Sequence, residues 1–356
     1  MKHILILGGT GAMGKHIVQL LKMEGHEVFV TSRSHRTNEF HITYIQGNAK
    51  DDAFLQETLK VQSWDVIVDF MIYSTQQFKE RLSLLLESCR QYIFLSSSRV
   101  YADTQPAITE TSPRLLDVSK DEKYLTTDEY ALSKAREENM LLSSTKKNWT
   151  IIRPYITFSE QRLQLGVLEK DYWLYQALHN RTIVFSRDIA ERTTTLTYGY
   201  DVARGIVALI GQSEALGKCF HITNSENHKW SEIFEVYKKV LTEVLGRVPK
   251  IKMIEKNPLV ETENGGWQAR YDRYFDRRFD NSNINKFIDT STFTPTLEGL
   301  EMCLRDFLKH PKFNIEGWTN FALYDRITGE WTPMSEIPTT KDRIKYLLRR
   351  TILPLK

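Results

Sequence analysis

Short runs of apolar residues alternate with segments of helical periodicity through the first half of the chain. The apolar runs predict strands at 4–7, 26–31, 42–45, 64–70, 92–96 and 149–152. Between them, apolar positions that recur every three to four residues predict helices over 14–24, 52–60, 75–90 and 128–144. Strands that alternate with helices are typical of a parallel, doubly wound sheet that is covered on both faces.

The second half is less regular. Its patterns predict strands at 182–185 and 195–198 and helices at 201–211 and 229–246, followed by a segment rich in aromatic and charged residues at 255–285. We therefore expect an α/β protein with a Rossmann-type sheet and a smaller C-terminal substrate-binding domain. The expected boundaries are 1–160 for the dinucleotide-binding domain, with 195–225 returning to it, 161–194 and 226–310 for the substrate-binding domain, and 311–356 for a C-terminal extension.

Composition narrows the class of protein. The 356 residues are 41% hydrophobic and 26% charged, and the net charge of +3 is too small to indicate nucleic acid as the main partner. Cys89, Cys219 and Cys303 lie far apart and in no metal-ligand spacing, so we expect neither a disulfide framework nor a metal site. The first apolar run is too short for a signal peptide, and no stretch is long enough to span a membrane. A cytoplasmic location is the expectation.

A glycine-rich turn follows the first predicted strand. Gly8, Gly11 and Gly14 recur every third residue and lead directly into the first predicted helix. Glycines let the backbone approach a pyrophosphate, and a helix N-terminus presents N–H groups to an anion. The turn, with Thr10, Ala12 and Met13, therefore indicates a dinucleotide site, and an ordinary strand-to-helix turn is the alternative.

Tyr130 and Lys134 stand four residues apart, on one face of a predicted helix. A tyrosine titrates near a pKa of about 10, and a nearby ammonium group lowers that value, so Tyr130 could exchange a proton with a hydroxyl or carbonyl group. About one such pair is expected by chance in a chain with 16 tyrosines. The order of the motifs along the chain therefore carries more weight than the spacing.

The fifth predicted strand ends in Ser96, Ser97 and Ser98, before Val100 and Tyr101. A parallel strand delivers its terminal side chains to the edge of the sheet where ligands bind. A serine hydroxyl there could bind the reacting oxygen of a substrate. The alternative is that the serines cap the following turn.

With these motifs in this order, residues 3–310 resemble the extended short-chain dehydrogenase/reductase family of epimerases, dehydratases and reductases. The resemblance rests on the glycine turn, the serine-rich strand end, Tyr130 with Lys134, Arg153-Pro154 and the Tyr-Asp-Val-Ala segment at 200–203. It implies Tyr130 as general acid/base, Ser97 as the group that polarises the substrate oxygen, and Lys134 as the residue that holds the nicotinamide ribose. Pro154 is expected beside the cofactor.

The end of the second predicted strand bears on the choice of cofactor. NAD-binding relatives carry an acidic residue there for the ribose hydroxyls. This chain has Ser32, Arg33 and Arg36 and no carboxylate from 32 to 36, so NADP is favoured over NAD, and a solvated basic loop is the alternative. Asn48, expected near the adenine, does not decide between the two.

Two departures from the family pattern concern the substrate. Arg99 stands where dehydratases carry an acidic residue, and Thr194 replaces an arginine that often grips a substrate diphosphate, with Arg192 two positions away. The main hypothesis is an NAD(P)-dependent oxidoreductase or epimerase acting on a nucleotide-linked sugar or similar hydroxy/keto substrate, with reduction favoured over epimerisation. The alternative is a non-catalytic dinucleotide sensor or RNA-binding module on the same fold.

Two expectations concern partners. Helices 75–90 and 128–144 could pair across the two-fold axis of a homodimer, by analogy with similar proteins. The segment 341–350 is basic and amphipathic, which suits either a helix at a membrane surface or, as the favoured interpretation, a helix packed on the body with a solvated basic face.

Overall fold

The parallel sheet predicted from the sequence lies in the first of two units into which the chain divides. The computed structural model describes residues 1–105, 107–261 and 266–351. The first unit comprises Met1–Thr157, Thr195–Asn227 and Arg277–Thr296, and the second comprises Phe158–Thr194, His228–Asp276 and the chain from Leu297 onward. The last five residues of the expected C-terminal extension, 352–356, lie outside the described residues. Each unit is described by itself.

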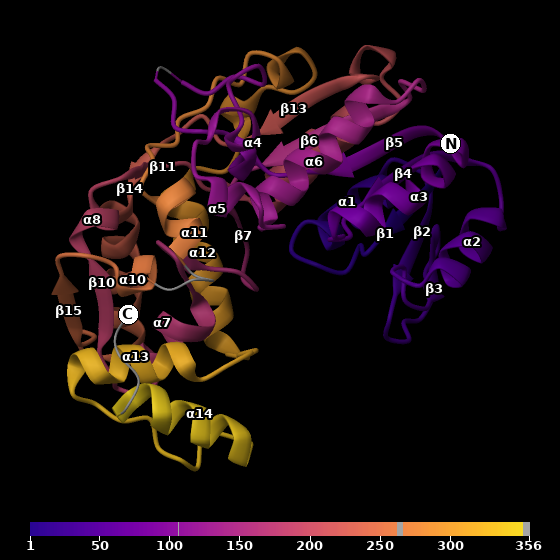
Figure 1. Cartoon of the computed structure of the whole chain (residues 1–356). Helices are drawn as coiled ribbons and strands as arrows, with labels where there is room; N and C mark the ends of the chain where they lie inside the picture. Colours follow the sequence, from indigo (N-terminus) through magenta and orange to yellow (C-terminus); the bar gives the residue numbers. More distant parts are fainter. Residues whose placement is uncertain (106, 262–265, 352–356) are drawn as a thin grey trace. The chain divides into compact units, whose positions relative to one another are not determined.

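Seven strands form the sheet of the first unit (Figure 1). They are β1 (His3–Leu7), β2 (Glu27–Ser32), β3 (Ile42–Gln46), β4 (Trp64–Asp69), β5 (Cys89–Leu95), β6 (Trp149–Pro154) and β13 (Lys218–Ile222). Their order is β13-β6-β5-β4-β1-β2-β3, and every pairing is parallel. This confirms the doubly wound sheet, to which β13 adds a strand that the apolar pattern did not predict.

Helices α1 (Gly14–Met23) and α9 (Gly199–Leu209) pack on one face of this sheet, and α2 (Asp52–Lys60), α3 (Thr75–Glu87) and α6 (Tyr130–Ser143) pack on the other. The short helices α4 (Leu115–Val118) and α5 (Glu122–Leu125) belong to the same unit. The short elements of this unit are η1 (Ser98–Val100), η2 (Ser213–Ala215), η5 (Ile284–Lys286), η6 (Thr290–Thr292) and the strand β12 (Thr197–Tyr198). Side-chain caps begin α2 and α3, where Asp51 accepts the N–H of Phe54 and Ser74 forms a capping box with Gln77.

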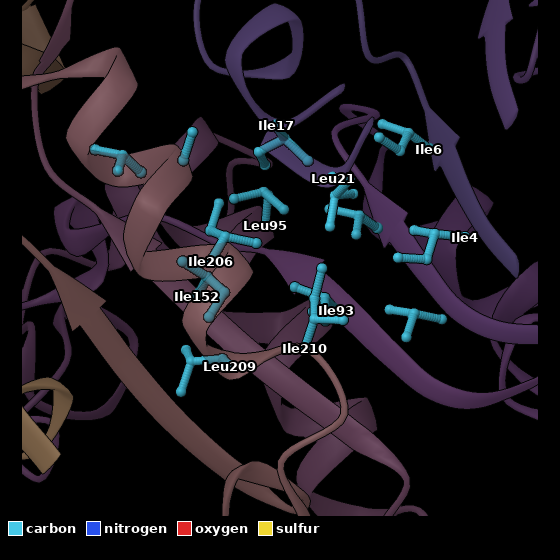
Figure 2. Close-up of a cluster of buried hydrophobic side chains, with 14 of the residues drawn as sticks. Ile4, Ile6, Ile17, Leu21, Ile93, Leu95, Ile152, Ile206, Leu209 and Ile210 are labelled. Atoms are coloured by element: carbon cyan, nitrogen blue, oxygen red, sulfur yellow. The ribbon is translucent and has the colours of Figure 1, made fainter. Parts of the chain in front are cut away.

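The apolar core divides at the sheet because successive side chains of a strand point to opposite faces. Ile4 and Ile6 of β1 join a cluster with residues of α1 and α9, which Figure 2 shows. Leu5 and Leu7 join a second cluster with residues of α2 and α3. All four side chains are fully buried, which explains why β1 is a continuous apolar run.

The two edge strands each donate a backbone N–H to a side-chain oxygen. On β3, the N–H of Tyr44 donates to Oδ1 of Asn38 at 2.8 Å. On β13, the N–H of His221 donates to Oε1 of Glu110 at 3.2 Å.

The second unit combines small sheets with helices. Its elements are β8 (Gln164–Leu165), β9 (Leu168–Glu169), α7 (Lys170–Leu178), β10 (Ile183–Ser186), α8 (Arg187–Ala190), β11 (Thr193–Thr194), β14 (His228–Lys229), α10 (Trp230–Leu245), β15 (Ile251–Ile254), η3 (Pro258–Glu261), α11 (Gly266–Gln268), the π-helical turn η4 (Ala269–Arg273), α12 (Thr296–Lys309), α13 (Thr319–Thr328) and α14 (Thr340–Thr351). The strand β7 (Thr157–Phe158) spans the boundary with the first unit. Aromatic side chains dominate the core, and Trp173 stacks on Tyr237 with ring centroids 4.6 Å apart.

Candidate functional site

The glycine turn leaves β1 in a backbone conformation that requires glycine. Gly8 has a φ of +76°, in the left-handed region that side chains rarely tolerate. Its N–H donates to Oγ1 of Thr31 on β2 at 3.0 Å, and its carbonyl accepts the N–H of Thr10 at 2.9 Å. The turn is therefore tight and tied to the neighbouring strand.

The other glycines of the turn differ in what surrounds them. A Cβ on Gly14 would lie 2.5–2.7 Å from backbone atoms of Gly9, so helix α1 packs directly on the turn. At Gly11, in contrast, no described heavy atom lies within 4 Å of the position of a Cβ. No described side chain caps the start of α1 at Met13. The turn thus combines an open space at Gly11 with a helix start that has no side-chain cap at Met13, which suits a bound pyrophosphate. The N–H groups of Lys15 and His16 donate to the carbonyls of Gly11 and Met13 at 3.2 and 3.1 Å.

The end of β2 presents an exposed basic loop at the same edge of the sheet. The buried Ser32 donates its hydroxyl to the carbonyl of Ser34 at 2.8 Å. Arg33 and Arg36 are exposed, and the Arg36 guanidinium lies 5.8 Å from the centroid of the Tyr44 ring. The two guanidinium groups therefore lie on the loop that begins where β2 ends.

Asn48 and Pro154 follow the ends of two other strands. Asn48, after β3, is exposed, and its Oδ1 accepts the N–H of Lys50 at 3.1 Å. Pro154 is the last residue of β6 and is half-buried. Because the strands are parallel, these residues, the glycine turn and Ser32 all belong to the carboxyl edge of the sheet.

The three serines after β5 have different partners. Ser96 donates to Oε1 of Glu138 at 2.6 Å, and Ser98 donates to the carbonyl of Arg153 at 2.8 Å. Ser97 instead accepts the N–H of Arg99 at 3.2 Å and begins η1. Ser96 and Ser98 therefore use their protons inside the protein, and Ser97 is the serine whose position suits donation to a substrate oxygen.

Arg99 connects Ser97 with Tyr130. Tyr130 is the first residue of α6 and is half-buried, and the Arg99 guanidinium lies 5.3 Å from the centroid of its ring. The same guanidinium pairs with Oε1 of Glu129 at 2.5 Å, and the other carboxylate oxygen of Glu129 accepts the N–H of Ala131 at the start of the helix. The departure at Arg99 thus places a cation above the tyrosine ring.

Lys134 is buried and paired. Its ammonium group lies 2.9 Å from Oε2 of Glu137 and 4.5 Å from the centroid of the Phe94 ring. Ser133 donates to the other oxygen of Glu137 at 3.1 Å. Burial raises the pKa of Glu137, while Lys134 and the Ser133 hydroxyl act to lower it. The sequence analysis did not single out Glu137, although its three-residue spacing from Lys134 is that of a helical ion pair.

Asp69 is a second buried carboxylate near this lysine. It ends β4 and accepts hydrogen bonds from the hydroxyls of Tyr92 at 2.8 Å and Tyr73 at 3.1 Å and from the N–H of Met71 at 2.8 Å. Burial raises the pKa of Asp69, although these donors and the charge of Lys134 act to lower it. Burial also raises the pKa of Tyr92 well above its usual value. No spacing signal in the sequence marks Asp69.

A buried ion pair between Glu138 and Arg153 joins the elements around Ser97 and Tyr130. The Arg153 guanidinium donates to both carboxylate oxygens of Glu138 at 2.7 Å and to the hydroxyl of Tyr101 at 2.9 Å. Arg114 adds a third charged donor to Glu138 at 3.1 Å. The network joins the end of β6 to α6 and to the chain after β5, so it fixes the elements that carry Ser97 and Tyr130.

The sequence and the fold of this chain are similar to those of known proteins. The sequence model of the family described as "NAD dependent epimerase/dehydratase family" matches residues 4–222. The chain is 23% identical over 275 residues to the chloroplast stem-loop binding protein of 41 kDa b of Arabidopsis thaliana, and that match covers 72% of this chain and 66% of the plant protein. It is 35% identical over 63 residues to the epimerase family protein YfhF of Bacillus subtilis, a match that covers 17% of this chain and 21% of YfhF. The chain thus spans less than two thirds of the length of these curated relatives.

Solved structures with the same fold include three bacterial proteins. The Bordetella bronchiseptica enzyme WbmH, in complex with NAD+, has a TM-score of 0.67 at 15% identity, with 88% of this chain and all of that chain covered. The dTDP-glucose 4,6-dehydratase of Bacillus anthracis, in complex with NAD, has a TM-score of 0.65 at 14% identity, with 87% and 97% covered. The UDP-glucuronic acid 4-epimerase of Bacillus cereus, with UDP-glucuronic acid and NAD, has a TM-score of 0.62 at 19% identity, with 87% and 100% covered.

Proposed function

The chain belongs to the NAD dependent epimerase/dehydratase family, and from that premise we propose that it is an enzyme that transfers hydride between a nicotinamide dinucleotide and a carbon that bears a hydroxyl or keto group. The observation that carries the proposal is the arrangement at one edge of the sheet. That edge has a glycine turn that is open at Gly11 and has no side-chain cap at Met13, together with the hydroxyl of Ser97 and the phenol of Tyr130. A binding module would need the turn but would not need the phenol and the hydroxyl.

The residues of the turn suit a dinucleotide. Gly11 leaves open the space that a pyrophosphate would fill, and the N–H groups at the start of α1 would bind it. When bound, the cofactor supplies the carbon that accepts or donates hydride. Pro154 and Asn48 stand at the same edge of the sheet and would contact the cofactor on either side of the turn.

Tyr130 would hold the proton that the reaction moves. As alcohol is oxidised, the proton leaves its hydroxyl for the phenolate oxygen of Tyr130; as the carbonyl is reduced, it returns. Ser97 would donate its hydroxyl to the same substrate oxygen and orient it. The Arg99 guanidinium lies 5.3 Å from the centroid of the Tyr130 ring and would hold that ring in position.

Lys134 would contribute less charge at Tyr130 than an unpaired ammonium group would. Its partner Glu137 places a carboxylate 2.9 Å away, so the field of the pair falls off faster with distance than that of a single cation. Arg99 is paired in the same way, with Glu129 at 2.5 Å, so we assign positioning roles to both Arg99 and Lys134.

The proposed substrate is a nucleotide-linked sugar, and the proposed cofactor preference is NADP. The solved neighbours that act on such sugars hold NAD. Here the loop after β2 has two exposed guanidinium groups and no carboxylate between 32 and 36, which suits a 2′-phosphate. A cofactor that exchanges with solvent suits net reduction better than epimerisation, so we favour a reductase.

Turnover assays test the enzyme proposal. Purified protein is incubated with UDP-glucuronic acid or dTDP-glucose and with oxidised or reduced NAD or NADP, while nicotinamide absorbance and the NMR spectrum of the sugar are followed. Tyr130→Phe is expected to abolish turnover and to leave the dinucleotide Kd within about twofold, since it removes only the proton-carrying oxygen. Tyr172→Phe, on α7 in the second unit, is the matched control and should retain full activity. Equal turnover in Tyr130→Phe and the unmodified protein would contradict the assignment.

The non-catalytic alternative makes different predictions. It expects dinucleotide binding without turnover of any sugar nucleotide, and salt-dependent binding of a hairpin RNA. The name of the plant relative refers to stem-loop binding, so a hairpin RNA is the probe for this arm of the experiment. RNA binding that persists in Tyr130→Phe, together with no turnover, would replace the enzyme proposal.

A further inference from the structure

The helix α14, in the second unit, is fixed to that unit along one side only. The buried Tyr346 donates its hydroxyl to Asp325 at 2.6 Å and packs in the core around Phe321. Arg343 donates to the carbonyl of Ile337 at 2.8 Å, and the Arg350 guanidinium lies 4.4 Å from the centroid of the Trp331 ring. These three helix residues follow each other at three- and four-residue spacing, so they form one stripe that faces the unit.

The apolar residues of α14 lie outside this stripe. Ile344 is 53% exposed, and Leu347 and Leu348 are each 40% exposed. At 3.6 residues per turn, with Arg343 taken as zero, Leu347, Ile344 and Leu348 lie at about 40°, 100° and 140° around the helix axis. The helix therefore presents an apolar arc to solvent, whereas a helix of a globular protein usually buries such an arc.

Basic residues border the arc on both sides. Arg343 and Arg350 lie on one side, and the exposed Lys341 and Lys345 lie at about 160° and 200° on the other. The helix from Thr340 to Thr351 carries five basic residues and one acidic residue, while the whole chain has a net charge of only +3. Positive charge is thus concentrated at this helix.

Trp331 extends the exposed apolar surface beside the helix. Half of its side chain is exposed, and its ring contacts the Arg350 guanidinium and lies 6.3 Å from Tyr346. Tryptophan is enriched at the boundary between lipid headgroups and acyl chains because its ring is amphipathic. We define the basic apolar face as Trp331, Lys341, Ile344, Lys345, Leu347 and Leu348.

We propose that the basic apolar face binds the surface of a membrane that contains anionic lipids. An apolar arc between two cationic borders is the pattern by which amphipathic helices lie in the plane of a bilayer interface. Among the described residues, no helix is long and apolar enough to cross a membrane, so the proposed contact is peripheral. A second copy of the chain would bring five cations against five, and a polynucleotide would leave the apolar arc unused, so lipid is the occupant that uses both features.

The proposal is independent of the enzymatic one and needs no substrate. The full chain is mixed with vesicles of phosphatidylcholine alone or of phosphatidylcholine with phosphatidylglycerol, and bound protein is measured by flotation. Binding is expected only with phosphatidylglycerol, and it should weaken as salt is added. Lys341→Glu with Lys345→Glu should weaken it at least about 25-fold, since each basic residue near an anionic surface contributes about fivefold.

The apolar arc is tested separately. Leu347→Ser with Leu348→Ser should abolish the binding, while Val244→Ser, an equally exposed apolar residue on α10, and Lys60→Glu, an exposed lysine on α2, should leave it unchanged. All of these side chains are exposed, and circular dichroism verifies that each variant is folded. No binding to the phosphatidylglycerol vesicles, or equal binding by the arc variants, overturns the proposal. So does binding of RNA in preference to vesicles, or a dimer that dissociates when Leu347 and Leu348 are changed.

Discussion

Removal of the Glu138 carboxylate should destabilise the first unit more than any exposed charge change can. Glu138 is fully buried and accepts hydrogen bonds from Ser96, from Arg114 and from Nε and Nη2 of Arg153. In Glu138→Ala, Arg114 keeps its pair with Asp117, but Arg153 is only 3% exposed and loses its counter-charge. The stranded guanidinium is the source of the predicted effect.

The size of the effect follows from that burial. Breaking a buried ion pair by removing one partner costs about 3–5 kcal/mol, because the remaining charge stays desolvated. Native proteins have a total stability of about 5–15 kcal/mol, so the variant should lose a large share of it. Glu57→Ala is the control, because Glu57 pairs with Lys60 at 3.1 Å with both side chains mostly exposed. That change should alter the free energy of unfolding by about 1 kcal/mol or less.

Urea denaturation followed by circular dichroism measures both variants against the unmodified protein. A second variant tests the mechanism: Glu138→Leu combined with Arg153→Met replaces the pair with apolar groups, and it should recover much of the loss because no charge is left buried. A loss below about 1 kcal/mol in Glu138→Ala would refute the reasoning. So would a double variant that is less stable than Glu138→Ala.

Three further predictions concern the glycine turn, the basic loop and the buried carboxylate of β4. Gly14→Ala should lower the free energy of unfolding by about 1–3 kcal/mol in urea denaturation, because its Cβ would meet the backbone of Gly9. Gly11→Ala should leave the fold intact and weaken dinucleotide binding, which calorimetry measures. Arg33→Ala with Arg36→Ala should weaken NADP binding about 10-fold or more and leave NAD binding unchanged in calorimetric titrations; tighter binding of NAD than NADP by the unmodified protein would contradict the preference itself. Burial raises the pKa of Asp69 above its usual 3.8, so the stability contributed by its bound proton is complete below pH 3.8 and is lost as pH rises through the raised pKa. The free energy of unfolding of the unmodified protein minus that of Asp69→Asn should therefore fall as pH rises. A difference that does not change with pH would contradict this prediction.

Four of the strands that the sequence predicted, β1, β4, β5 and β6, are buried along most of their length. β1, for example, has four consecutive apolar residues that are all fully buried, so its pattern is independent of what packs on it. β13 was missed because it reads Lys-Cys-Phe-His-Ile, in which polar residues interrupt the apolar ones. The strand at the other edge, β3, was predicted because its residues Ile-Thr-Tyr-Ile are β-branched or aromatic, so composition and not edge position separates the two.

In the candidate site, too, the sequence predicted some residues and not their partners. The spacing of Tyr130 and Lys134 and the resemblance to the family pointed to Tyr130 and Ser97, and both assignments stay predictions. The burial of Lys134 against Glu137 depends on how α6 packs on the sheet, which no local pattern encodes. Likewise, the helix at 341–350 was expected, but the exposure of its apolar arc depends on which face Tyr346 fixes.

The side-chain oxygens at the two edges of the sheet affect how the protein behaves at high concentration. An open strand edge presents unpaired N–H and C=O groups and can recruit a strand from another molecule, which is a route to aggregation. Here Asn38 occupies the N–H of Tyr44 on β3, and Glu110 occupies the N–H of His221 on β13. A strand arriving at either edge would have to displace that oxygen, and at β13 the Glu110 carboxylate is already buried and also accepts a hydrogen bond from Asn283 at 2.7 Å. Both ends of the sheet are therefore protected against growth by strand addition, and Asn38 and Glu110 are positions where an apolar substitution would promote self-association.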